Sequence, residues 1–218
     1  MMLGADGVHS VVRETLHLEF KGSSFPEAWP LYDIELDCPL DLESAHVSFV
    51  QSGLVFLLCL RDGLWRLFGN VPELLERLPP GTKTGRISWQ SSFHIGHRVA
   101  AQDVVGHVAL AGDAAHIHSP VAARGMNLGI EDAYVFAKCA ADELHGGDRR
   151  LADYGRIRHA VHAGVVERIK KLTQLARGRP ELVALFRRYL IPGLTKFPPT
   201  AHQMMKLVTG LDHAVEVK

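Results

Sequence analysis

The sequence predicts an α/β protein, and the stretch from Gly106 to Ala133 carries most of that prediction. Residues 107–111 form a short apolar run that stops at Gly112 and Asp113, which is typical of a buried strand ending in a turn. A loop follows, and apolar residues then recur at three- and four-residue steps, as on a helix face. Alternating apolar residues between 29 and 95 and helical periodicity beyond 147 are the other two observations.

The N-terminal segment begins with a predicted turn over residues 4–7. A short helix is predicted over 8–18, with Arg13 on it. As a pattern alone, Arg13 fits a solvated charge on a helix surface.

Short apolar runs between residues 29 and 95 predict an antiparallel meander. The runs at 31–36, 45–50, 54–60 and 64–68 are separated by Pro, Ser-Gly and Asp-Gly turn signals. Residues 87–95 alternate strictly, with one side apolar except for Ser91.

The C-terminal part is predicted to be helical. Apolar residues from Leu151 to Leu175 recur at helical spacing, and the segment ends at Gly178 before Pro180. Further helices are predicted over 180–190 and 201–208. The basic residues of the first helix have no interleaved aromatic residues, so we interpret them as a solvated face.

The composition is that of an ordinary globular protein. Of 218 residues, 47% are hydrophobic and 22% are charged, and the formal net charge is +0. The charge balance gives no reason to expect nucleic acid or a membrane as a partner, and no apolar run is long enough to span a bilayer. The three cysteines, Cys38, Cys59 and Cys139, have no paired spacing, which favours reduced thiols and a cytoplasmic location.

Thirteen histidines raise the alternative of a metal site, chiefly at His116 with His118 and at His94 with His97. Zinc sites need three or four converging ligands with supporting hydrogen bonds, and alternate positions on a loop do not provide them. We therefore predict no metal ligands.

Two motifs resemble those of a known family. GHVALAGDAAHIHSP, from Gly106 to Pro120, is similar to the GD motif of the FAD-dependent aromatic hydroxylases, the single-component flavoprotein monooxygenases of the para-hydroxybenzoate hydroxylase type. GADGVHSVVRE, from Gly4 to Glu14, is similar to the DG motif of the same family. The resemblance implies a partial FAD/NAD(P)-binding, Rossmann-like domain with an antiparallel substrate-binding sheet and C-terminal helices.

The resemblance also implies roles for individual residues. Asp113 would hold ribityl or ribose hydroxyls of FAD, the loop after Pro120 and the helix start would lie against the isoalloxazine ring, and the DG motif would touch both FAD and NAD(P)H. The implied cofactor-binding residues are Asp6, Gly7, Arg13, Gly112, Asp113, Pro120, Gly125, Met126 and Asn127. No residue is predicted to act as a catalytic acid, base or nucleophile.

The sequence departs from the family pattern in two places. The GxGxxG turn that binds the FAD pyrophosphate, part of a βαβ unit expected before the DG motif, does not occur in the 218 residues. Where the family usually has Gly-Gly after the proline, this chain has Ala122 and Ala123. Glycines in such loops allow positive φ angles or close approach of a ligand. These alanines are therefore expected to disturb the binding of the flavin ring against this loop.

These observations predict a domain division and two alternative functions. Residues 1–28 and 96–178 form the partial FAD-binding domain, 29–95 the substrate-binding sheet and 179–218 a helical segment. The first function is hydroxylation of a small aromatic or apolar substrate with NAD(P)H and O₂, on the condition that the missing βαβ unit is supplied. The alternative is a non-catalytic remnant or assembly partner that does not hold FAD. Self-association, or a partner chain carrying the βαβ unit, is expected because the strand at 107–111 would lack its neighbour in the sheet.

Overall fold

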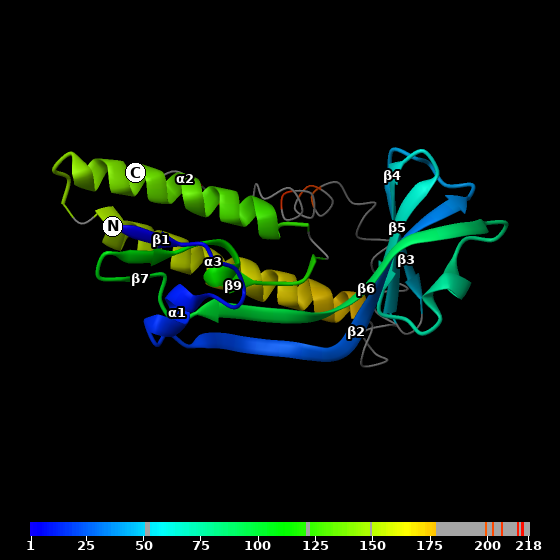
Figure 1. Cartoon of the computed structure of the whole chain (residues 1–218), viewed down its shortest axis with the longest axis horizontal. Coiled ribbons are helices and arrows are strands. Elements are labelled where there is room, and N and C mark those ends of the chain that lie inside the picture. The colour runs from blue at the N-terminus through cyan, green and yellow to red at the C-terminus, as the bar shows by residue number, and fades with distance from the viewer. Residues whose placement is uncertain are drawn as a thin grey trace. The chain divides into compact units, whose positions relative to one another are not determined.

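The computed structural model of the chain describes residues 1–50, 53–120, 123–148 and 150–177, and five isolated positions after 177. The chain divides into two compact units (Figure 1). Unit 1 comprises Met1–Ser24, Gly96–Leu172 and Leu194–Lys218, and unit 2 comprises Phe25–Ile95 and Thr173–Gly193. The helix predicted over 180–190 lies outside the described residues, and of the helix predicted over 201–208 only positions 202 and 206 are described.

Unit 1 contains a three-stranded sheet in the order β1-β8-β7. Strand β1 (Met2–Gly4) runs parallel to β8 (Val108–Leu110), and β7 (Val104–Val105) pairs with β8 in the antiparallel sense. The strand predicted at 107–111 is thus confirmed, but β1 was not predicted. The expectation that the 107–111 strand itself would be an open edge is wrong, because β1 pairs with it; in the described part of the chain the edge strands of this sheet are β1 and β7.

Two long helices complete the core of unit 1. Helix α2 (Gly125–Leu144) and helix α3 (Arg150–Arg177) follow the sheet strands in sequence, and the end of α3 contributes to unit 2. Buried Ala109 of β8 packs in one cluster with residues of both helices, including Val135, Cys139 and Tyr154. The short helix α1 (Val11–Thr15) is capped by Ser10, whose Oγ accepts a hydrogen bond from the Arg13 N–H.

Short elements lead from β8 to α2. The 3₁₀ turn η2 (Gly112–Ala114) follows β8, and strand β9 (His116–Ile117) then pairs antiparallel with β6 (Lys83–Ala100). The predicted order of strand, acidic turn, loop and helix is therefore present, with β9 added in the loop.

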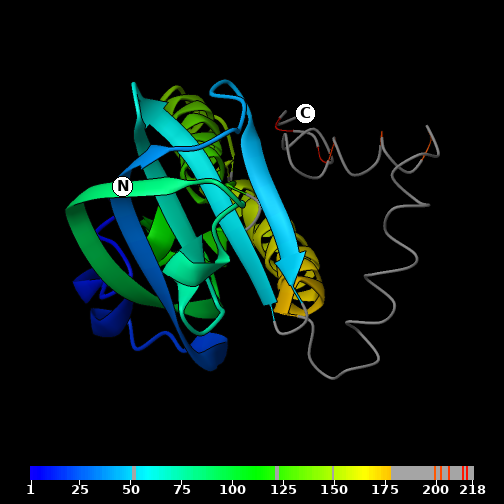
Figure 2. The ribbon, with the colours of Figure 1, turned by 90° about the vertical axis from the view of Figure 1, so that its right-hand side faces the viewer.

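Unit 2 is built on an antiparallel meander, as predicted (Figure 2). Its strands are β3 (Ala45–Val50), β4 (Gly53–Arg61) and β5 (Leu64–Gly69), with the adjoining parts of β2 (Phe20–Asp37) and β6, in the sheet order β3-β4-β5-β2-β6-β9. One face forms a buried cluster with the 3₁₀ turn η1 (Leu74–Arg77) and includes Ile34, Leu36, Val55, Leu57, Trp65 and Leu67. The buried residues alternate along each strand because successive side chains of a strand point to opposite sides.

The alternating side of β6 is buried over only part of its length. Ile95 is buried and Phe93 is half-buried, whereas Ile87 and Trp89 are 41% and 48% exposed. In the described part of the chain, no helix is long and apolar enough to cross a membrane.

Candidate functional site

The GD turn, which we define as Gly112–Ala114, directs a carboxylate to solvent. Gly112 has a φ of +58°, a conformation that glycine adopts without a steric penalty. The preceding Ala111 is extended and buried, so the chain turns sharply as it leaves the core. The Asp113 side chain is exposed, which leaves its oxygens able to accept hydrogen bonds from ligand hydroxyls.

The start of helix α2 lies directly beside the GD turn. A methyl group built on Gly129 would stand 3.4 Å from the Gly112 Cα, so the first turn and a half of the helix packs against the turn. Gly125 begins the helix, Met126 is 77% exposed, and Asn127 is exposed. The N-cap residue, Arg124, makes no side-chain cap, so the first N–H groups remain available to an electronegative ligand atom.

The loop between these two elements contains a strained residue. Pro120 is exposed, and Ala123 has a φ of +52°, in the left-handed region that glycine prefers. The expectation that the family's Gly-Gly allows positive φ here agrees with this angle at Ala123. Ala122 lies outside the described residues.

The DG segment makes its contacts within the protein. The exposed Asp6 carboxylate accepts hydrogen bonds from Ser10 Oγ at 2.5 Å and from the Val12 N–H at 3.2 Å, and the Ser10 bond holds the pKa of Asp6 below its usual value. Gly7, with a φ of +86°, makes the turn between them.

Arg13 connects this segment to the GD turn. Its side chain is buried, donates to Ala114 O at 3.0 Å and Val8 O at 2.8 Å, and lies over the Phe20 ring at 4.0 Å. The structure brings Arg13 and the GD turn together through this contact. A direct contact of Arg13 with a cofactor stays a prediction.

A buried network that sequence reasoning missed supports the GD turn from behind. The Asp132 carboxylate is fully buried and accepts four hydrogen bonds. Its Oδ2 accepts from the Gly112 N–H at 2.9 Å and from His116 Nε2 at 2.8 Å. Its Oδ1 accepts from Arg158 Nε at 2.8 Å and His162 Nε2 at 2.7 Å.

Burial and hydrogen bonding oppose each other in this network. Burial alone would raise the pKa of Asp132, but the bonds from His116 and His162 outweigh it and hold that pKa far below its usual range. Burial lowers the pKa of His116 despite its bond to Asp132. For His162, burial is outweighed by the contacts with Asp103 and Asp132, which raise its pKa.

The same cluster contains a possible set of metal ligands, which its chemistry disfavours. Ligand atoms of His116, Asp132 and His162 lie within 4.8 Å of one another. However, the Arg158 guanidinium and the Gly112 N–H already occupy the Asp132 oxygens, and a cation held on the same carboxylate opposes a metal ion. We interpret the cluster as a hydrogen-bonded ion network.

Unit 2 carries a row of aromatic rings on the sheet face opposite its buried cluster. The centroids of Phe56 and Phe68 are 4.5 Å apart, those of Phe68 and Phe93 are 6.3 Å apart, and those of Trp29 and Phe93 are 6.2 Å apart. Such spacings are typical of favourable aromatic pairs. Trp29 and Phe68 are buried, so only the half-buried rings of Phe56 and Phe93 are candidates for contact with an aromatic molecule.

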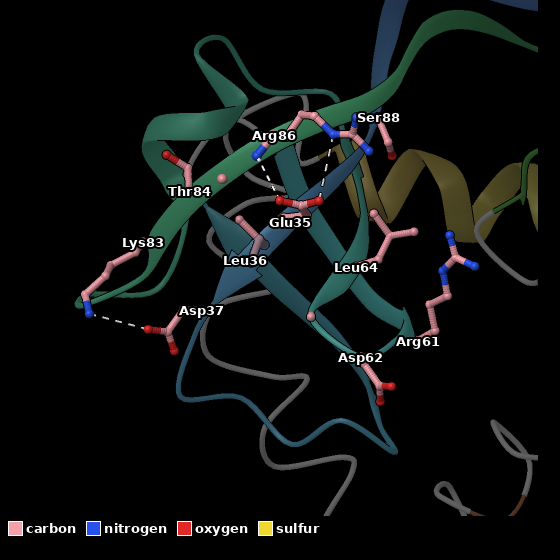
Figure 3. A pocket seen from close by; sticks show the side chains of 12 residues that line it. Glu35, Leu36, Asp37, Arg61, Asp62, Leu64, Lys83, Thr84, Arg86 and Ser88 are labelled. Atoms are coloured by element: carbon pink, nitrogen blue, oxygen red, sulfur yellow. Dashed lines mark hydrogen bonds and ion pairs between the residues drawn. The ribbon is translucent and has the colours of Figure 1, made fainter.

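A hollow of about 590 Å³ in unit 2 has a different character (Figure 3). Two ion pairs cross it, Arg86 with Glu35 at 3.9 Å and Lys83 with Asp37 at 3.4 Å. None of the predicted site residues lines it, and its charged walls do not suit a small apolar molecule.

Comparison with known proteins gives consistent results. Residues 71–169 match a family described as an FAD binding domain. The chain is 34% identical to 6-methylpretetramide 4-monooxygenase of Streptomyces rimosus over 68% of this chain and 29% of that protein. It is 28% identical to rifampicin monooxygenase of Streptomyces venezuelae over 99% of this chain and 49% of that protein. The chain thus spans half or less of the length of these relatives.

Solved structures share the fold. The Diels-Alderase PyrE3 of pyrroindomycin biosynthesis superposes with a TM-score of 0.82 at 24% identity, over 95% of this chain and 49% of that one. The p-nitrophenol 4-monooxygenase PnpA of Pseudomonas putida gives 0.73 at 21% identity, over 94% and 58%. The match of residues 71–169 and the sequence relatives, together with the GD and DG motifs that contact each other in unit 1, lead to one conclusion: the chain is related to the FAD-dependent aromatic hydroxylases.

Proposed function

We propose that the protein takes part in the FAD-dependent hydroxylation of a small aromatic or similarly apolar substrate, with NAD(P)H as reductant and O₂ as co-substrate. The observation that carries this proposal is the exposed Asp113 carboxylate on a turn packed against the uncapped start of α2. The relatives named as monooxygenases support it.

The residues present fit part of FAD. Asp113 can accept hydrogen bonds from ribityl or ribose hydroxyls, and Gly112 allows the turn that exposes it. The N–H groups of Gly125, Met126 and Asn127 stand at the positive end of a 20-residue helix dipole, which suits the electron-rich side of a flavin ring.

When bound, FAD supplies the redox chemistry that activates oxygen. The tasks left to the chain are to hold the ring, to stabilise negative charge with the α2 dipole and to keep water from the reacting atoms. None of these tasks requires a nucleophile, so the proposal assigns no residue as catalytic acid, base or nucleophile.

The pyrophosphate of FAD is the part for which no cradle is found, because no GxGxxG turn occurs in these 218 residues. We include in the proposal a βαβ unit provided by another polypeptide segment, placed against the β1 side of the sheet. The half-buried rings of Phe56 and Phe93, backed by the buried rings of Phe68 and Trp29, are the proposed contact for the substrate ring.

The test is the visible spectrum of the purified chain before and after addition of FAD. Flavin absorbance that stays with the protein through gel filtration, near one equivalent, is the expected result. NAD(P)H oxidation in the presence of phenolic substrates would then identify the reaction. A colourless protein after FAD addition, both alone and with a family βαβ unit, would instead favour the non-catalytic alternative.

A further inference from the structure

The position of the GD turn depends on one carboxylate. The Gly112 N–H, immediately before Asp113, donates to Asp132 Oδ2 at 2.9 Å, and this bond joins the turn to helix α2. Because Asp113 is the next residue, a movement of the Asp132 carboxylate would change where the Asp113 side chain points.

Asp132 is in turn held from helix α3. Its Oδ1 accepts hydrogen bonds from Arg158 and from His162, and all three side chains are fully buried. The second ring nitrogen of His162, Nδ1, lies 2.8 Å from Asp103 Oδ2, and Asp103 is also buried. His162 therefore lies between two carboxylates.

The contacts of His162 define which of its nitrogens donates. An ionised carboxylate only accepts hydrogen bonds, so Nε2, which is bonded to Asp132, carries a hydrogen. Nδ1 lies at ion-pair distance from Asp103 Oδ2 without the geometry of a hydrogen bond, and a positive charge on the ring favours that contact. Asp132 contacts both Arg158 and His162, and Asp103 contacts His162. The half-buried Glu131 also accepts a hydrogen bond from Arg158, at 3.2 Å.

Two other histidines face this group. The His116 ring, on β9, lies 4.1 Å from the His162 ring between centroids, and His159, one turn earlier on α3, lies 3.5 Å from Asp103 Oδ1. His116 donates to Asp132 Oδ2, whereas His159 does not contact Asp132. His159 is therefore a natural control for His162.

Resting on the FAD-binding function proposed above, we propose that His162 is a positioning residue for the GD turn. Its Nε2–H fixes the Asp132 carboxylate, Asp132 fixes the Gly112 N–H, and the turn then presents Asp113 to the ribityl or ribose hydroxyls. The role is indirect, since His162 is fully buried.

Two matched double variants separate this donor role from charge balance. Both carry Asp103→Asn, which removes the carboxylate beside His162 Nδ1. When the His162 charge is then lost as well, Asp132 still has its ion pair with Arg158, and no buried carboxylate of the pair is left without a cation. His162→Gln places an amide N–H near the position of Nε2, whereas His162→Leu removes the donor. His159→Leu, which alters the same helix and a neighbour of Asp103, is the control.

The readout is amide hydrogen exchange at Gly112 in the ¹⁵N-labelled full chain. We expect exchange at Gly112 to be about tenfold faster in Asp103→Asn/His162→Leu than in Asp103→Asn/His162→Gln, and FAD to bind about tenfold more weakly. The glutamine variant and His159→Leu should keep exchange at Gly112 within about threefold of wild type. Equal exchange in the two double variants would overturn the proposal.

A measurement on the wild-type chain covers the case in which a variant does not fold. At about pH 7.5, ¹⁵N spectra should show both ring nitrogens of His162 protonated, although free histidine is mostly neutral there. A His162 whose Nε2 carries no hydrogen would overturn the proposal, because it could not donate to Asp132. If wild type bound no FAD, the hydroxylase function would fail, while exchange at Gly112 would still decide the role of His162.

Discussion

Replacing Ala123 with glycine should relieve backbone strain in the loop before α2. Ala123 has a φ of +52° and lies outside the helices and strands. The left-handed conformation costs an L-residue about 1–2 kcal/mol, and glycine avoids this cost. Glycine, however, gains about 0.4–1 kcal/mol of conformational freedom in the unfolded chain.

The difference between these two quantities gives the expected magnitude. Ala123→Gly should change the free energy of unfolding by between zero and about +1.5 kcal/mol. For a chain of this size the melting temperature would rise by up to about 5 °C. The matched control is Ala137→Gly, the same substitution at an exposed position inside α2, which should lose about 1 kcal/mol.

Thermal and urea unfolding of both variants, with an FAD fluorescence titration, provides the assay. If strain is the whole effect, stability rises and FAD affinity is unchanged, since the strain is present in the free and bound protein. If the methyl group also blocks the flavin, affinity rises too, and more so in Ala122→Gly/Ala123→Gly. A loss of stability in Ala123→Gly equal to that of Ala137→Gly would refute the strain argument. Equal or weaker FAD binding by the double variant would show that the alanines are not the obstacle.

Three further predictions address the cofactor, acid stability and assembly. Asp113→Ala should weaken FAD binding at least about tenfold in a titration, because it removes a charged hydrogen-bond acceptor; unchanged affinity would remove Asp113 from the site. Burial lowers the pKa of His97 in the folded chain to about 4, whereas a histidine in the unfolded chain has a pKa of about 6.5. Between these two pH values the unfolded chain binds one proton more than the folded chain. The free energy of unfolding therefore falls by up to about 3 kcal/mol as the pH drops through that window. His97→Gln should lessen this loss in urea melts at pH 7 and about 4.5, whereas His94→Gln, at an exposed position of the same strand, should not. Light scattering should show dimers or larger species that pair through the β1 edge, and a monodisperse monomer with a cooperative melt would contradict this expectation.

The sequence predicted the elements whose patterns are long. Strands β3, β4 and β5 follow from apolar runs of about five to seven residues bounded by turn signals, and helix α3 follows from helical spacing over more than twenty residues. Strand β1 has three residues and β9 has two, which is too short for any period to be visible. Their positions come from pairing with β8 and β6, which are distant in the sequence.

The site shows the same division. Asp113, Gly125 and Asn127 could be named because one contiguous motif carries them. The network behind them could not, since Asp103, Asp132 and His162 are separated by about thirty residues each and meet only in the folded protein. For Arg13 the motif predicts a contact with the cofactor, which stays a prediction. Its bonds to two backbone carbonyls depend on burial and could not be read from the motif.

The parallel pairing of β1 with β8 has a consequence for the order of folding. It joins Met2 to Val108, so forming it closes a loop of more than a hundred residues, while β3, β4 and β5 are connected by short turns. Loop closure costs more entropy as the loop lengthens, and contacts distant in sequence form slowly. We therefore expect the meander, which lies in sequence between Ser24 and Gly96, to form first. Its formation would shorten the flexible loop that pairing of β1 with β8 has to close. A substitution that slows the meander, such as one in its Asp62-Gly63 turn, should then delay formation of the proposed flavin site, although that site contains no residue of the turn.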